Sequence, residues 1–94
     1  KNHFDHWQSK LKEGFDKNQY LFAKEILNIA SENSTISSSE ISNLAAKHDL
    51  DQDDAKEAIH SLVYDGYINN NDNAKVYRFN SPILRIWWNK YVAN

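Results

Sequence analysis

The stretch from residue 51 to residue 65 carries the strongest periodic pattern of apolar residues in the chain. These residues recur at alternating steps of three and one: Ala55, Ala58, Ile59, Leu62 and Val63. This spacing predicts an amphipathic helix, because it gathers the apolar side chains on one face of a helix with 3.6 residues per turn. Asp51 is expected to cap the N-terminus of this helix, and Gly66 is expected to follow its C-terminus.

The next segment, residues 67–79, is predicted to form a β-hairpin. Aromatic and β-branched residues at 67–68 and 75–79 flank an Asn-rich tip at 69–74. Earlier in the chain, residues 35–36 can form only a stub of strand, and a helix is predicted at 38–47 with Ile41, Leu44 and Ala45 on its buried side. Ser37 and Glu40 have the spacing of a capping box at its start. Two helices joined by a short turn and followed by a hairpin are typical of a winged helix-turn-helix.

Three further helices are predicted around this unit. A stripe of Phe4, Trp7, Leu11 and Phe15 indicates a helix at 3–16, and a second helix follows at about 19–31. Ser81 and Pro82 have the order expected at the start of a C-terminal helix. The predicted fold class is therefore mainly α with a small β-hairpin: a winged helix-turn-helix with an extra N-terminal helix and a C-terminal helix. It forms one domain over 1–94, with a lead-in helix in 1–18, the helix-turn-helix at 38–65, the wing at 67–79 and the C-terminal helix at 82–93.

The composition excludes several classes of protein and site. The chain has 94 residues and no cysteine, which excludes disulfides, thiolate zinc sites and a cysteine nucleophile. It contains no long apolar run, so we expect no membrane partner and a cytoplasmic location. It starts at Lys1 and has no methionine, so we expect a piece excised from a longer protein.

The sequence contains few motifs that are typical of catalytic or metal-binding sites. His3 and His6 have helical spacing with Asp5 between them, but no third histidine or cysteine has a suitable position for a metal site. The two glycines are 52 positions apart, so a phosphate-binding loop of the G-x-x-x-x-G-K-[ST] type is absent. We therefore expect no catalytic residue, no metal and no cofactor in this chain, which is predicted not to be an enzyme by itself.

The C-terminal part resembles a known family. Three short motifs carry the resemblance: Asp65-Gly66-Tyr67-Ile68, Tyr77-Arg78-Phe79-Asn80-Ser81-Pro82-Ile83-Leu84-Arg85 and Trp87-Trp88. They are similar to the C-terminal winged-helix region of bacterial and archaeal-type P-loop ATPases of the STAND/AAA-like group. The resemblance covers roughly residues 19–93. It implies a parent protein whose upstream domain binds ATP and Mg²⁺. In such proteins the winged helix either docks on the ATPase domain and regulates it, or contacts DNA.

The charge distribution bears on this choice. Residues 49–72 contain seven acidic side chains against one lysine, whereas residues 73–94 contain four basic side chains and no acidic one. DNA-reading helices usually present Arg, Lys, Asn or Gln at their start, but here the start is Asp51-Gln52-Asp53-Asp54. We therefore expect a regulatory or docking domain that binds the ATPase domain of the same protein, or another protein. The residues expected to bind the partner are Asp53, Asp54, Lys56, Arg78, Arg85 and Trp88.

DNA binding through the wing and the C-terminal helix is the alternative. The residues that would then contact DNA are Gln52, Lys56, Lys75, Arg78, Arg85 and Lys90. Trp87 and Trp88 are adjacent, so one of them is expected to fill the core and the other to be partly exposed at an interface. The competing interpretation is that the helix at 3–16, through Phe4 and Trp7, covers both tryptophans.

Overall fold

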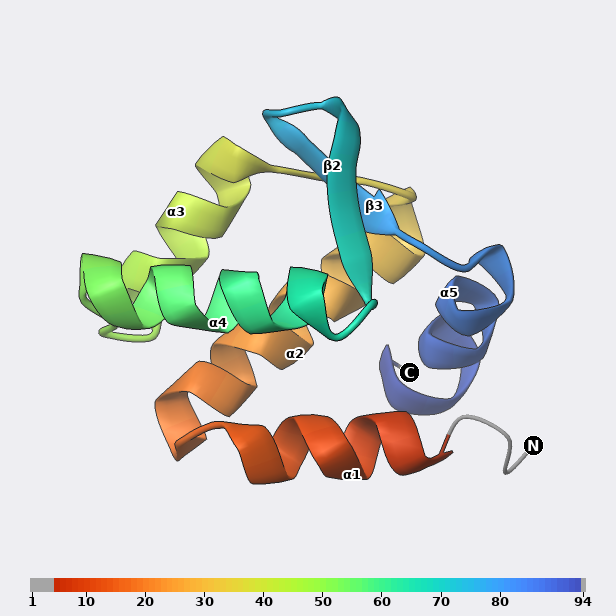
Figure 1. Cartoon of the computed structure of the whole chain (residues 1–94), viewed down its shortest axis with the longest axis horizontal. Coiled ribbons are helices and arrows are strands. Elements are labelled where there is room, and N and C mark those ends of the chain that lie inside the picture. Colours follow the sequence, from red (N-terminus) through yellow and green to blue (C-terminus); the bar gives the residue numbers. More distant parts are fainter. Residues whose placement is uncertain (1–4, 94) are drawn as a thin grey trace.

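The computed structural model describes residues 5–93 and consists of helices around a small sheet (Figure 1). The elements in chain order are α1 (Asp5–Gly14), α2 (Lys17–Asn33), β1 (Ile36–Ser37), α3 (Ser38–Lys47), α4 (Gln52–Tyr64), β2 (Ile68–Asn73), β3 (Val76–Phe79), α5 (Pro82–Trp88) and a π-helical segment η2 (Asn89–Ala93). This architecture confirms the predicted fold class, mainly α and winged-helix-like.

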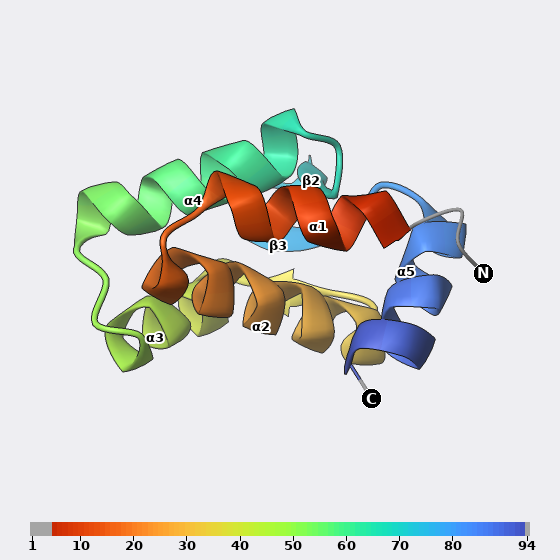
Figure 2. The same ribbon diagram turned by 90° about the horizontal axis from the view of Figure 1, so that it is seen from below.

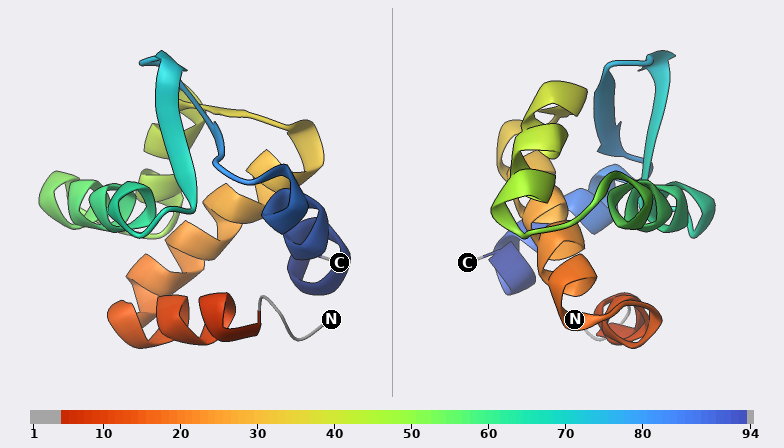
Figure 3. Two further views of the ribbon diagram at one scale, coloured as in Figure 1. Left: turned by 45° about the vertical axis from the view of Figure 1, so that its right-hand side comes forward. Right: turned by 90° about the vertical axis from the view of Figure 1, so that its left-hand side faces the viewer.

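Helix α2 is the centre of the core. Its side chains Phe22, Ile26, Leu27 and Ala30 are fully buried, and α3, α4, α5 and the sheet all contact this helix. Helix α1 lies below α2 and α4 in Figure 1 and runs alongside them when the molecule is seen from below (Figure 2). The hairpin of β2 and β3 projects beyond the helices on the opposite side (Figure 3). The helix-turn-helix and the wing thus share one core with the flanking helices.

The predicted helix ends are confirmed by their hydrogen bonds. Asp51 accepts the backbone N–H of Asp54 at 2.8 Å. Ser37 and Glu40 form the predicted capping box at the start of α3. Ser81 caps α5, and Pro82 is its first residue. Gly66 has a φ of +88°, the left-handed region that favours glycine, and so ends α4 as predicted.

The sheet combines the predicted hairpin with the predicted stub of strand, which lies at Ile36–Ser37. Its three antiparallel strands have the order β1-β3-β2, with Ile36 opposite Tyr77. Strand β2 continues through the asparagine run that was predicted as a loop, and the tip is a turn at 74–75. Asparagine side chains support this ladder: Asn70 donates to the Ala74 carbonyl at 3.0 Å, and Asn73 accepts from the Lys75 N–H at 2.9 Å. A bulge between Asn69 and Asn73 accommodates the extra residues.

The C-terminal end differs from the prediction in two ways. The predicted helix at 82–93 is α-helical to Trp88 and then continues as η2. The expected exposure of one tryptophan is wrong, because Trp87 is 9% exposed and Trp88 is 0% exposed. Trp88 is enclosed by α2 and by Tyr67, whose ring centroid lies 6.5 Å away, and its Nε1–H donates to Asn28 at 2.9 Å. Trp87 lies against the rings of Trp88 and Tyr91.

Helix α1 is linked to Trp88 through one intermediate ring, that of Tyr67. Trp7 meets Tyr67 edge-on at 4.8 Å, and Tyr67 donates its hydroxyl hydrogen to the Trp7 carbonyl at 2.5 Å. Burial, together with the charge of Asp65, raises the pKa of the Tyr67 hydroxyl above its ordinary range. Phe4, the other residue expected to cover the tryptophans, is outside the described residues. Among residues 5–93, no helix is long and apolar enough to cross a bilayer.

Candidate docking site

An apolar groove opens between the two helices of the helix-turn-helix and the wing. Its volume is about 430 Å³, within the range of about 300–1,000 Å³ that is usual for binding pockets. We call it the helix-turn-helix groove. It is lined by Ser38, Ile41, Ser42, Ala45, Ala46, Leu50, Asp51, Gln52, Ala55, Lys56, Ile59 and Tyr77.

The same helical stripes that build the core supply the floor of this groove. Ala45 of α3 and Ile59 of α4 have the apolar spacing that predicted core positions, but each remains partly exposed. The lining combines the small side chains of Ala45, Ala46 and Ala55 with the larger ones of Leu50 and Tyr77. The groove is therefore an apolar surface that the chain does not cover with its own described residues.

The polar rim of the groove is mixed but becomes acidic toward the turn between α3 and α4. Asp51 and Gln52 line the groove there, and Lys56 follows one turn later on α4. Asp53 and Asp54 are exposed in the first turn of α4, where the helix dipole favours negative charge. The Asp51 carboxylate thus caps α4 and also lies at the edge of the groove.

Neighbouring carboxylates act on one another at this end of α4. The pKa of Asp54 is raised above its ordinary value, mainly by the negative charge of Asp51. Slight desolvation and the charges of Asp16, Glu57 and Asp53 add to the effect. A partner with positive charge would relieve this repulsion, whereas a DNA phosphate would increase it.

Gln19 holds the start of α4 in place, a role that the sequence analysis missed. The residue is 5% exposed, and its Nε2 donates to the Asp54 carbonyl at 3.1 Å and to Glu57 at 2.9 Å. Asp16 caps α2 by accepting the Gln19 N–H at 2.8 Å, in a capping box with Gln19. The Asp-x-x-Gln spacing was the available signal for this box, but it does not reveal the link to α4.

Three residues expected to bind a partner have other contacts in the structure. Arg78 pairs with Asp72 across the hairpin at 3.4 Å, with both side chains at least half exposed. Arg85 donates from Nη1 to the Ser31 carbonyl at 3.0 Å, near the C-terminus of α2. Trp88 is fully buried, so it cannot reach a partner in this conformation and is a core residue instead.

Asp53, Asp54 and Lys56 are exposed on α4. Lys56 lines the helix-turn-helix groove, whereas Asp54 lines a separate hollow beside the start of α2, and Asp53 lines neither. The structure brings these three together on α4, whereas Arg78 and Arg85 lie on other elements.

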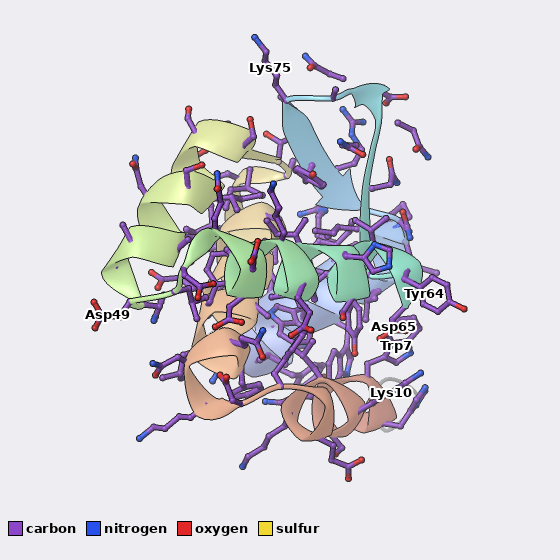
Figure 4. The ribbon with its side chains drawn as sticks, turned by 60° about the vertical axis from the view of Figure 1, so that its left-hand side comes forward. Trp7, Lys10, Asp49, Tyr64, Asp65 and Lys75 are labelled. Carbon is purple, nitrogen blue, oxygen red and sulfur yellow. The ribbon has the colours of Figure 1, made fainter. Side chains whose placement is uncertain are left out.

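The residues expected to bind DNA are spread over the molecule. Lys75 points away from the helices at the tip of the hairpin, far from Asp49 at the turn between α3 and α4 (Figure 4). Lys90 lies in η2, with its Nζ 5.3 Å from the centre of the Tyr91 ring. Gln52 and Lys56 are exposed on α4 among carboxylates. The described residues therefore do not gather the six into one basic patch.

The stretch that carries the family resemblance has structural roles. Phe79 and Leu84 are buried, and Ser81 caps α5. Arg85 and Trp88 bind polar groups of α2. This stretch fixes how the C-terminal helix packs on α2, so its residues explain the fold more directly than a binding site.

The described residues contain no group of three or more side chains that could hold a metal ion, and His3 lies outside them. No protein-family model, curated protein or solved structure matches the chain.

Proposed function

We propose that this chain is a docking module that binds a protein segment in the helix-turn-helix groove. The observation that supports this most is the apolar floor of the groove, on a winged-helix unit whose α4 begins with carboxylates. Exposed apolar grooves suit protein partners, because burying the apolar surface favours association. The module is non-catalytic, and its partner is the ATPase domain of its own parent or another protein.

The resemblance to P-loop ATPases gives this proposal its context. A C-terminal docking module in such a protein would regulate the upstream domain, which would supply the ATP and Mg²⁺ site. The polar contacts of Arg85 and Trp88 with α2 support a rigid module, because they hold the C-terminal helix against the central helix. A rigid module loses little conformational entropy when it binds.

Selection from a displayed library of random 16-residue peptides tests the proposal. Wild-type protein is expected to enrich peptides that two groove variants do not retain. Ile59→Glu places a charge on the floor, and Ala46→Trp fills the groove from an exposed position on α3. His60→Glu is the matched control, because it adds the same charge one residue later at an exposed position that does not line the groove.

All four proteins are first compared by circular dichroism and urea unfolding, so that loss of binding is not confused with loss of folding. Enrichment that is absent on wild type, or equal on the groove variants, would contradict docking in the groove.

A DNA titration tests the alternative. A mixed-sequence duplex at about 50 mM salt is followed by fluorescence anisotropy, where phosphate contacts are only weakly screened. We expect no binding. Micromolar binding that falls steeply with salt, and that is lost in the double variant Lys75→Glu with Lys90→Glu, would favour DNA instead. Arg85 is left unchanged, because it contacts α2.

A further inference from the structure

The helix-turn-helix groove also indicates the chemistry of its occupant, provided that the proposed docking function holds. We infer that the groove binds an amphipathic helix that carries Lys or Arg residues at the end lying next to the turn between α3 and α4. Three properties of the groove lead to this inference: its bounding elements, its floor and its charge.

The bounding elements favour a helix over an added strand. A peptide that joins a sheet needs an open strand edge. Strand β3, which contributes Tyr77 to the groove, lies between β1 and β2, and Tyr77 is paired with Ile36. Its backbone is therefore occupied at the groove. An amphipathic helix needs no backbone partner, because its own N–H and C=O groups are paired internally.

The floor suits the side chains of one helical face. Ala45, Ala46 and Ala55 are small, so a partner helix can approach closely, whereas the partly exposed Leu50, Ile59 and Tyr77 add larger apolar surfaces. Helices that bind in such grooves insert apolar residues at positions i, i+3 or i+4, and i+7. We therefore expect this pattern in the occupant.

The negative charge at one end of the groove favours a partner that is positively charged at that end. Asp51 lines this end, Asp53 is exposed two residues later on α4, and Asp49 lines the neighbouring hollow together with Leu50 and Asp54. Lys47, the nearest cation on α3, already pairs with Glu25 at 3.0 Å. The N-terminus of α4 contributes only about half a positive charge, and it is already engaged by its cap. The end next to the turn therefore remains negative despite Lys56.

The test uses peptides from the selection described above. The enriched sequences are expected to combine the i, i+3 or i+4, i+7 apolar pattern with a Lys or Arg excess at one end. One such peptide is synthesised together with a counterpart whose basic residues are replaced by Glu. Both are titrated by fluorescence anisotropy at low and high salt.

Two variants at the start of α4 identify the carboxylates involved: Asp51 lines the groove, and Asp53 lies just outside its lining. Asp51→Asn keeps the helix cap, because Asn is as good an N-cap as Asp, and removes the charge. Asp53→Asn removes a second charge. Each is expected to weaken the basic peptide about two- to fivefold at low salt, the usual effect of an exposed charge pair, and less at high salt. Glu13→Gln is the control, because it removes a carboxylate from α1, a helix that contributes no residue to the groove.

The outcomes separate this inference from the docking proposal. Groove-dependent peptides without basic residues, or equal binding of the Lys and Glu forms, would overturn the charge rule and leave docking intact. Groove-dependent peptides rich in Pro or β-branched residues, which remain non-helical when bound, would overturn the helical occupant. If no peptide depends on the groove, both proposals fail.

Discussion

Gln19 offers a sharp test of how the start of α4 is held. Its buried side chain donates two hydrogen bonds, one to the Asp54 carbonyl and one to Glu57. Gln19→Leu keeps a similar volume and removes both donors. A net hydrogen bond contributes about 0.5–1.5 kcal/mol, and one to a charged group contributes about 1.5–3 kcal/mol. Glu57 is exposed and water can replace its lost donor, so we expect a loss of about 2 kcal/mol in unfolding free energy.

Gln19→Glu extends this test to the direction in which stability changes with pH. The new carboxylate would face the Asp54 carbonyl and the Glu57 carboxylate, two acceptors, from a site that is 5% exposed. Burial and the like charge would raise its pKa in the folded protein. An acid whose pKa is higher in the folded protein than in the unfolded chain destabilises the fold at every pH above its unfolded pKa. The loss of unfolding free energy at pH 7 should therefore be larger for Gln19→Glu than for Gln19→Leu. It should shrink as the pH falls to about 4, near the ordinary pKa of Glu.

Urea unfolding followed by tryptophan fluorescence at pH 7 and pH 4 measures both effects. A loss of about 2 kcal/mol corresponds to a decrease of about 8–16 °C in Tm for a domain of this size. Gln52→Glu, at an exposed position of α4, is the control and should change stability by less than about 0.5 kcal/mol. If Gln19→Glu is as stable as wild type at pH 7, the contacts from α2 to α4 do not hold the helix as described.

Three further predictions concern stability. Replacement of Asp51 by Ala should cost about 1 kcal/mol, because it removes the cap of α4, whereas Asp51→Asn should cost far less; urea unfolding compares the two. Arg85→Leu should cost about 1.5 kcal/mol, because it removes a charged donor from the Ser31 carbonyl, and a lower Tm for Arg85→Leu than for Lys90→Leu would show this. Burial alone would raise the pKa of Glu25, but hydrogen bonds from His48 at 2.7 Å and Lys47 at 3.0 Å lower it below its ordinary value. The ionised Glu25 therefore stabilises the fold at pH values above its ordinary pKa, and this contribution is lost as the pH falls through its lowered pKa. The stability advantage of wild type over Glu25→Gln should shrink in acid. An advantage that grows in acid would show that the pKa is not lowered.

The features that local chemistry determines could be predicted from the sequence. Ser37, Asp51 and Ser81 cap helices as their positions indicate, and Gly66 ends α4 where a positive φ is needed. Each of these depends on hydrogen bonds or dihedral angles within a few residues. The helical stripe of α4 likewise follows from its own spacing.

The features that depend on distant contacts could not be predicted in the same way. The side chains of Gln19 and Arg85 reach partners 35 and more positions away, which no local pattern reveals. Strand β2 extends into the asparagine run because β3 pairs with it and the asparagine side chains bond backbone groups nearby. Trp88 is buried because α2 and Tyr67 meet over it. The sequence placed Ala45 and Ile59 on apolar faces, but only the way α3 and α4 each pack on α2 leaves them partly open in a groove.

Chemical-shift mapping of the isotopically labelled chain with a selected peptide tests groove docking most directly. We expect the largest changes in backbone amide shifts at Ala45, Ala46, Ile59 and Tyr77, together with nuclear Overhauser contacts between the peptide's apolar side chains and the Ile59 methyl groups. Changes confined to the hairpin tip around Lys75 or to η2 around Lys90, with none in the groove, would contradict docking at this site.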